Sequence, residues 1–392
     1  MAEPGSRRIE IGLVLQGGGA LGAYEWGAVT ALLDLIAKAR SDGLAVELRG
    51  VTGVSVGAIN AACVVGSTSL ADAQRRLSGL WADLTLHAPP FTPPTMARDL
   101  AFFGLPGFYV PRADVWNLPA WTSLYDTSPL LRTLRTHVDF GALNASGTAF
   151  VVTAVDLESG ALTRFRNAAG RPPPSAGAEP DASDPAVTIG PEHVLASGSL
   201  APQFPWTEIG GRRYWDGGLV DNTPLGDAID ALSADPATIR LLVVMNLYPL
   251  RARVPANMGA VLDRVHELSF GNRLRQDRDA AKQVNAMLAT IDDLATRLEA
   301  GGGEIPGALR ERIAQFARLK LVEVLEVDFQ DRGPSGETRF DDENGLRDFS
   351  AGTVEQRRAY GYELATARLA CAFTPTRETA GRTAFRSRLM TT

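Results

Sequence analysis

Ser55 is the residue of this sequence whose type and setting most clearly point to covalent chemistry. It lies in Gly53-Val54-Ser55-Val56-Gly57, which matches the Gly-x-Ser-x-Gly pattern. In a nucleophile elbow this pattern forms a tight turn between a strand and a helix. Small residues flank the turn, and the serine hydroxyl is exposed at the helix start. The alternative interpretation is a glycine-rich turn in which Ser55 only caps the helix.

A second glycine-rich turn, Gly17-Gly18-Gly19-Ala20-Leu21-Gly22, also lies between a predicted strand and a predicted helix. It matches the Gly-x-Gly-x-x-Gly pattern of dinucleotide-binding folds, so a dinucleotide-binding oxidoreductase is one alternative. That fold needs an acidic residue about 20 positions later, closing the next strand, and neither Asp42 nor Glu47 fits well. In the other interpretation, consecutive glycine amides form an oxyanion hole by donating hydrogen bonds to a tetrahedral intermediate.

A serine nucleophile needs a base, and Asp216 is the strongest candidate. It is preceded by Tyr214 and Trp215 and followed by Gly217-Gly218, a setting in which the backbone approaches closely and a carboxylate is partly desolvated. The alternative is an aspartate that only forms the turn. The four histidines (His87, His137, His193 and His266) are not in glycine-rich strand ends, so we expect surface or packed side chains. Only His266 follows the acid and could complete a Ser-His-Asp triad of the α/β-hydrolase type.

These residues need a scaffold that brings the two glycine turns together. Residues 9–15 and 47–53 are apolar runs typical of buried strands, and residues 20–40 and 56–65 show helical spacing of apolar side chains. Because strand, glycine turn and helix alternate, we predict an α/β fold with three layers (α/β/α) around a mainly parallel central sheet. Further predicted elements are a hairpin of residues 148–157 and 161–166, strands at 239–247 and 321–329, and helices at 258–299 and 353–370.

The chain also divides by composition. We predict a catalytic domain at residues 9–247 and a mainly helical C-terminal extension at residues 248–392 that packs on it. Residues 89–129 combine eight prolines with many aromatic side chains, which favours a cap inserted over the site rather than an irregular packed loop. Residues 169–185 are rich in proline and small residues, which predicts a flexible surface loop.

The overall composition narrows the class of protein. Of 392 residues, 45% are apolar and 21% charged, as in soluble globular proteins. The net charge of −6, from 39 basic and 45 acidic residues, argues against a nucleic-acid-binding protein. Cys63 and Cys371 fit neither a disulfide framework nor a zinc site.

Residues 50–71 are uncharged, but their polar and glycine content predicts a buried strand, turn and helix rather than a membrane span. Because residues 1–16 lack a cleavable signal pattern, we expect a cytoplasmic protein with peripheral contact to a membrane.

Taken in order, the turn at Gly17–Gly22, the elbow at Gly53–Gly57 and the Asp216–Gly218 turn resemble the patatin family of lipid acyl hydrolases. The resemblance covers about residues 9–247, and residues 196–205 and 222–225 resemble the segments on either side of the family's aspartate. This chain departs from the pattern at Leu21, where many members carry Arg or Lys, and in having Asp-Gly-Gly instead of Asp-Gly-Ala. Residues 347–350 and 355–357 resemble the C-terminal block of bacterial members with a helical extension.

The resemblance implies a patatin-like fold and a serine hydrolase that cleaves lipid acyl esters as a phospholipase, lysophospholipase or carboxylesterase. Ser55 is then the nucleophile and Asp216 the general base of a catalytic dyad. The implied oxyanion hole is formed by Gly17, Gly18, Gly19 and Val56, and the turns are supported by Gly22, Gly53, Gly57, Gly217 and Gly218. The family also includes acyltransferase and polyester-cleaving activities. The resemblance implies a lipid or other acyl-ester substrate, with no cofactor and no metal, and it makes no prediction of the oligomeric state.

Overall fold

The centre of the molecule is an eight-stranded mixed sheet. The computed structural model describes residues 8–89, 91–93, 96, 100–171, 184, 187–235, 238–248, 254–255, 258–300, 307, 320, 322–329 and 345–373. Five adjacent strands, in the order β10-β9-β1-β2-β5, are parallel, and β6, β8 and β7 are paired antiparallel beyond them. The predicted α/β fold with a mainly parallel sheet is confirmed. The strand bounds are β1 Arg8–Leu15, β2 Ala45–Gly53, β5 Ala149–Asp156, β6 Leu162–Arg166, β7 Thr207–Ile209, β8 Arg212–Asp216, β9 Thr238–Asn246 and β10 Glu323–Asp328.

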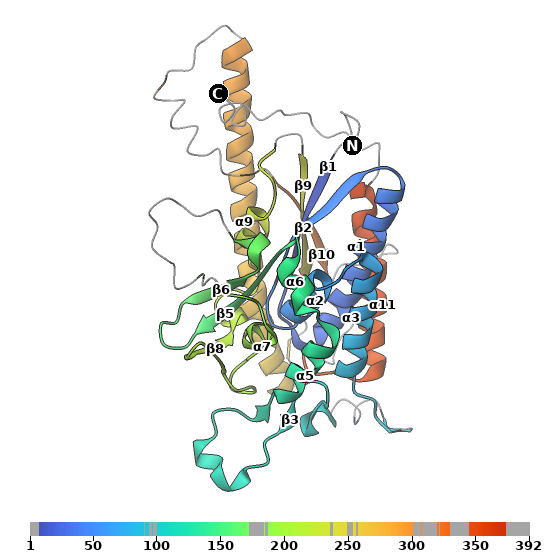
Figure 1. The fold of residues 1–392 in the computed structure, drawn as a ribbon, viewed down its shortest axis with the longest axis vertical. Coiled ribbons are helices and arrows are strands. Elements are labelled where there is room, and N and C mark those ends of the chain that lie inside the picture. The colour runs from blue at the N-terminus through green and yellow to red at the C-terminus, as the bar shows by residue number, and fades with distance from the viewer. Residues whose placement is uncertain are drawn as a thin grey trace.

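Helices cover both faces of this sheet, which gives the predicted three layers (Figure 1). The layer on one face contains α1, α2, α3 and α11, and α8 and α9 lie on the other side (Figure 1). The helix bounds are α1 Gly22–Ser41, α2 Val56–Val65, α3 Leu70–Leu84, α5 Ser128–His137, α6 Phe140–Ala145, α7 Pro191–Ser197, α8 Leu225–Asp230, α9 Met258–Ala300 and α11 Ala351–Leu369.

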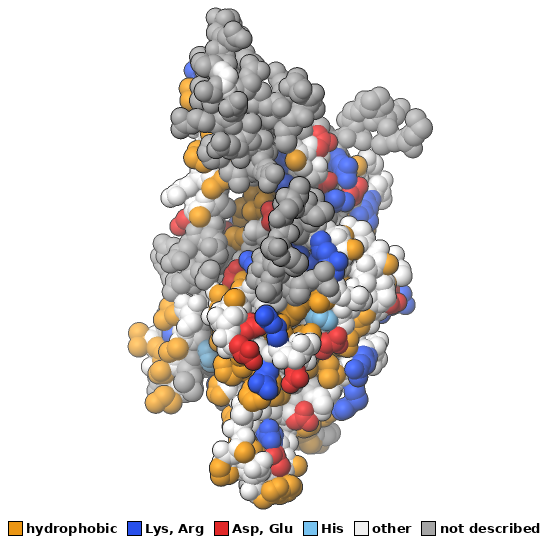
Figure 2. All heavy atoms as spheres, turned by 60° about the vertical axis from the view of Figure 1, so that its left-hand side comes forward, with side chains coloured by type: hydrophobic (Ala, Val, Ile, Leu, Met, Phe, Trp, Pro, Cys, Tyr) orange, Lys and Arg blue, Asp and Glu red, His pale blue; other side chains and the backbone are white. Residues whose placement is uncertain are grey.

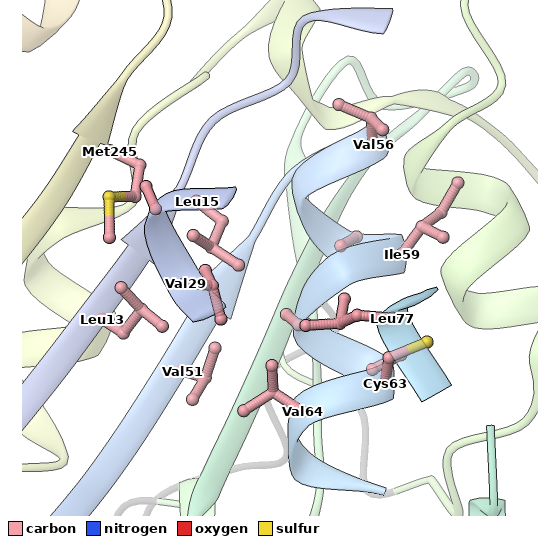
Figure 3. Close-up of a cluster of buried hydrophobic side chains, with 14 of the residues drawn as sticks. Leu13, Leu15, Val29, Val51, Val56, Ile59, Cys63, Val64, Leu77 and Met245 are labelled. Carbon is pink, nitrogen blue, oxygen red and sulfur yellow. The ribbon is translucent and has the colours of Figure 1, made fainter. Parts of the chain in front are cut away.

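The core follows from the alternation of side chains along the buried strands. Leu13 and Leu15 of β1 point to the face covered by α1 and α2, where they lie beside Val29 (Figure 3) and belong to the same buried cluster as Ile59 of α2. Val14, between them, points to the opposite face and packs in a smaller cluster under α8. Because both faces are covered, the central strands β1, β5 and β9 are apolar at most of their positions, as is usual for parallel sheets.

Residues beyond the predicted domain boundary at residue 247 contribute to the same core. Strand β10 pairs in parallel with β9 and so belongs to the central sheet. Helix α11 crosses α1 at two glycines, because a Cβ on Gly27 would overlap the carbonyl of Arg358 and a Cβ on Gly361 would overlap that of Tyr24. The division into residues 9–247 and 248–392 stays a prediction, and the described part of the extension is integrated with the sheet.

Several local predictions can be compared directly with the structure. The hairpin is confirmed, since β5 and β6 pair antiparallel. Residues 50–71 form the end of β2, the elbow turn, α2 and the start of α3, as predicted. Strand β8, which ends in Asp216, was missed, and its antiparallel pairing with β5 makes the sheet mixed. The predicted loop at residues 169–185 lies mostly outside the described residues.

The segment predicted as a cap has little regular structure, as its prolines require. Short strands β3 (Val110–Pro111) and β4 (Tyr125–Asp126) pair antiparallel, and short 3-10 helices η2 (Leu100–Phe103) and η3 (Val115–Ala120) accompany them. They lie at the lower end of the molecule in Figure 1.

By length and composition, one helix among the described residues, Gly19–Ser41, could cross a membrane, but it is mostly buried in the fold.

Candidate active site

Ser55 occupies a strained turn between β2 and α2. Its φ of 53° and ψ of −124° lie in a region that residues with a side chain rarely adopt. A Cβ on Gly53 would overlap the backbone of Gly57, and a Cβ on Gly57 would overlap the carbonyl of Leu15 at the end of β1. The two glycines of the Gly-x-Ser-x-Gly pattern are therefore needed so that the turn can fold back on itself and against β1.

Asp216 stands at the end of β8, where the chain enters the turn at Gly217. The amide of Gly218 donates a hydrogen bond of 2.8 Å to the Asp216 carboxylate, and the Ser55 side chain is near enough to the same carboxylate to act on its pKa. Burial raises the pKa of Asp216 to about 7, although the Gly218 amide and the Ser55 side chain act to lower it. A carboxylate with this pKa is a far better proton acceptor near neutral pH than an ordinary aspartate.

The first glycine turn places free amides beside Ser55. A Cβ on Gly17 would lie 2.9 Å from the Cβ of Ser55, so the two turns are in contact. No hydrogen bond joins the amides of Gly18, Gly19 and Val56 to another of the described residues, and they fit an oxyanion hole. The amide of Gly17, in contrast, donates to Oδ1 of Asn222 at 3.0 Å. Gly17 is therefore not available as an oxyanion donor, which corrects the expectation for this residue.

The remaining predicted glycines allow close approach between elements. A Cβ on Gly22 would lie 2.5 Å from a methyl carbon of Val56, which joins the two turns. A Cβ on Gly217 would overlap the carbonyl of Thr153 in β5, and one on Gly218 would lie 3.1 Å from Oδ1 of Asp216 itself. The Asp-Gly-Gly turn thus has no room for a larger residue at its first glycine.

Four buried or partly buried polar contacts around Gly17 were missed by the sequence analysis. Asn222 both accepts from the Gly17 amide and donates to the Gly17 carbonyl, at 3.0 and 3.1 Å. The hydroxyl of Tyr248 donates to the same carbonyl at 2.5 Å. Gln16 donates to the hydroxyl of Thr223 at 2.7 Å. Of the partners around Gly17, only Asn222 and Thr223 lay in a segment with a sequence signal, since residues 222–225 resemble the segment that follows the family's aspartate.

A cavity of about 750 Å³ opens over Ser55 and Asp216. Its apolar wall includes a cluster of rings in which Tyr109 lies 4.6 Å from Tyr125 and 5.4 Å from Phe204, between centroids. Phe108 adjoins this cluster, 5.4 Å from Phe204. The segment at residues 89–129 therefore supplies most of the aromatic lining.

Of the four histidines, only His266 lines this cavity, from α9, where its ring stacks on that of Phe270. His193 is buried and accepts from the amide of Gly190, His137 contacts Asp83, and His87 is exposed. The predicted surface or packed setting holds for these three. Among the described residues, no group of three or more His, Cys, Asp and Glu side chains is arranged to hold a metal ion.

The chain belongs to the patatin-like phospholipase family, since the model of that family matches residues 13–229. This membership implies a lipid acyl hydrolase with a lipid substrate. It confirms the family resemblance seen in the sequence, and it leaves the dinucleotide-binding oxidoreductase without support. No curated protein matches the chain.

Several solved structures have a similar but distant arrangement. VipD from Legionella pneumophila is 13% identical, with a TM-score of 0.39 and coverage of 93% of this chain and 67% of that one. Human GIVD cytosolic phospholipase A2, in complex with a fluorophosphonate inhibitor, is 12% identical, with a TM-score of 0.36. That match covers 98% of this chain, which spans 59% of the length of the human protein chain. The assignment to the family therefore depends on the family model.

Proposed function

We propose that the chain hydrolyses acyl ester bonds of lipids through an acyl-enzyme on Ser55. The observation that carries this proposal is that the Ser55 side chain and the buried Asp216 carboxylate lie together in one cavity, close enough for Ser55 to lower the pKa of that carboxylate. The amides of Gly18, Gly19 and Val56 bond to no other described residue, and these residues line the same apolar cavity as Ser55. Nucleophile, base, oxyanion donors and a lipid-sized space thus occur together.

In the first half of the reaction, Asp216 accepts the hydroxyl proton as the Ser55 oxygen bonds to the ester carbonyl carbon. The negative charge that develops on the carbonyl oxygen is stabilised by the amides of Gly18, Gly19 and Val56. When the tetrahedral intermediate collapses, the bond to the alcohol oxygen breaks. The alcohol takes the proton from Asp216 and leaves, and the acyl group stays on Ser55.

In the second half, a water molecule gives a proton to Asp216 and its oxygen bonds to the acyl carbon. The same amides stabilise the second oxyanion. Collapse of this intermediate breaks the bond to the Ser55 oxygen, which takes the proton back from Asp216. The fatty acid leaves, and the side chains return to their starting states. An acceptor alcohol in place of water would give the acyltransferase reaction.

The segment at residues 89–129 supports the proposal of a lipid substrate in two ways. Its buried rings, Phe108 and Tyr109, face the cavity and suit an acyl chain. Its tip exposes Trp116 and Leu118, which are 82% and 60% accessible. Hydrophobic side chains gather at this lower end of the molecule (Figure 2), as expected for a surface that rests on a lipid interface.

The test is to label the protein with a fluorophosphonate, map the modified residue, and measure p-nitrophenyl ester hydrolysis. Ser55→Ala should abolish labelling and lower kcat at least about a thousandfold. Asp216→Asn should lower kcat to a similar degree, because an amide accepts no proton at neutral pH. Labelling at another residue, or activity retained in Ser55→Ala, would show that the proposal is wrong.

A second candidate, a Ser-His-Asp triad, is favoured by one observation: His266 lines the same cavity as Ser55. The two mechanisms differ in the residue that accepts the proton. If Asp216 is the base, His266→Ala keeps most of the activity. If His266 is the base, this variant loses as much kcat as Ser55→Ala.

A further inference from the structure

Arg347 is the single Lys or Arg among the described residues that line the cavity. Its side chain is exposed, so the guanidinium stands where the cavity meets solvent. No hydrogen bond or ion pair joins this side chain to another described residue. The wall around it is apolar, with Leu346 and Phe349 as its neighbours in sequence. An unpaired cation at the rim of an apolar cavity is suited to a ligand that carries negative charge at one end.

The backbone on both sides of Arg347 is held in place. The carbonyl of Leu346 accepts a hydrogen bond of 2.9 Å from the amide of Ala20, in the turn that carries the oxyanion donors. The carbonyl of Phe349 accepts one of 2.8 Å from the amide of Leu86. The loop is therefore fixed one residue before Arg347 and two residues after it.

A buried arginine also stabilises this loop through hydrogen bonds. Arg357 of α11 is fully buried and donates to the carbonyls of Gly345 and Asp348, at 2.8 and 3.3 Å. The Asp348 carboxylate in turn accepts from the amide of Ser350 and the hydroxyl of Thr353, at 2.9 and 2.8 Å. Arg347 is thus presented on a rigid segment, which reduces the entropy that a bound anion would otherwise cost.

The charge of Arg347 also acts on the aromatic wall of the cavity. It acts to lower the pKa of the phenols of Tyr109 and Tyr125, against the larger effect of burial. The guanidinium therefore stands between the oxyanion turn and the aromatic wall of the cavity. A lipid whose ester lies on Ser55 and whose acyl chain lies among the rings would place its polar end near this position.

We propose that Arg347 binds the phosphate of a glycerophospholipid while the ester of that lipid lies on Ser55. A planar guanidinium matches the oxygens of a phosphate with two parallel hydrogen bonds. A neutral glyceride offers no such partner. The inference depends on the proposed function and deepens it, since it assigns phosphate-bearing lipids, rather than neutral esters, as the preferred substrates.

The experiment compares two soluble single-chain substrates with the same acyl group, a lysophosphatidic acid and a monoacylglycerol. We expect Arg347→Gln to lower kcat/KM for the lysophosphatidic acid about 10- to 100-fold, mainly through KM, and to leave the monoacylglycerol within about twofold. Arg347→Lys should recover part of the loss, because lysine keeps the positive charge but lacks the planar group that makes two parallel hydrogen bonds. Arg135→Gln removes an exposed arginine of α5 that does not line the cavity, and it controls for the change in net charge.

Each other outcome overturns the inference in a recognisable way. An equal loss on both substrates would assign Arg347 to the oxyanion site or to folding, and no loss on either would mean that it does not contact the phosphate. Inhibition by inorganic phosphate and by an alkyl phosphate is compared to decide whether the site binds a free anion or a lipid. Inhibition by millimolar phosphate as strong as that by an alkyl phosphate would contradict a lipid ligand. If the wild-type protein hydrolyses neither substrate, the proposed function itself fails, which differs from all of these results.

Discussion

The backbone amide of Ser55 donates a hydrogen bond of 3.0 Å to the hydroxyl of Ser197, although 142 residues separate the two. Ser197 is fully buried in the last turn of α7. The bond joins the strained elbow to the end of α7. Strained backbone at a site persists only where the surroundings hold it, so we expect Ser197 to position Ser55 for the proposed reaction.

Replacing Ser197 with alanine should lower kcat about tenfold while the protein stays folded, because one hydrogen bond to the elbow is lost. Steady-state hydrolysis of a p-nitrophenyl ester measures the effect. Ser199→Ala is the matched control, since Ser199 is also fully buried but bonds to Leu195 and Thr207 instead of the elbow. If both variants lose activity equally, the effect of Ser197 is general destabilisation and the positioning role is wrong.

The pH dependence of the reaction should follow the ionisation of Asp216, the proposed base. Because the pKa of Asp216 is raised to about 7, the free enzyme carries the ionised carboxylate only above that pH. We expect kcat/KM to rise as the pH increases through about 7 and to level off above it. A profile of kcat/KM between about pH 5 and pH 9 tests this. A profile already flat above about pH 5 would contradict a buried base of this kind.

Asn222→Asp should shift the pH profile of kcat/KM to higher pH. A Cβ on Gly218 would lie 2.9 Å from Asn222 Oδ1 and 3.1 Å from Asp216 Oδ1, so the two side chains flank the same backbone position. A second carboxylate here disfavours ionisation of Asp216 and should raise the midpoint by about one pH unit. Asn222→Ala is the control, since it also loses the bonds to Gly17 but adds no charge. It should lower kcat and keep the wild-type midpoint.

Asp216→Asn should stabilise the fold above neutral pH while it inactivates the protein. The folded-state pKa of Asp216, about 7, lies above its ordinary value of 3.8, so the fold loses stability as the pH rises from about 4 to about 7. The variant should gain up to about 4 kcal/mol over the wild type above that pH and little below about pH 4. Thermal unfolding at about pH 5 and about pH 8 measures the change. A gain of equal size at both values would rule out ionisation as its cause.

The exposed tip of residues 89–129 should control binding to lipid surfaces and not the chemical step. Trp116→Ser combined with Leu118→Ser removes two exposed apolar side chains and should weaken binding to phospholipid vesicles about tenfold or more. Vesicle sedimentation measures binding, and hydrolysis of a soluble p-nitrophenyl ester should stay unchanged. Leu294→Ser, at a 55% exposed position of α9, is the control and should bind vesicles like the wild type.

The residue pattern alone was enough to predict the elbow, the glycine turn, the aspartate and the class of fold. These features are local or nearly so: Gly53 and Gly57 are required by backbone contacts within one turn and its neighbouring strand. The parallel strands β1, β2 and β9 were predictable for a similar reason, because a strand that is covered on both faces is mostly apolar. The family resemblance then assigned roles to Ser55 and Asp216.

Only the tertiary structure decided which polar groups are engaged and which face the cavity. Gly17 is paired with Asn222, 205 residues away, while the amides of Gly18 and Gly19 stay free for the cavity among the described contacts. Likewise, Arg347 reaches the site because the carbonyl next to it bonds to Ala20. Such pairings depend on how distant segments meet when the sheet closes, and they leave no periodic or compositional signal at either residue. Chemistry that depends on an amide or a guanidinium without a partner is therefore set by the packing of the whole chain.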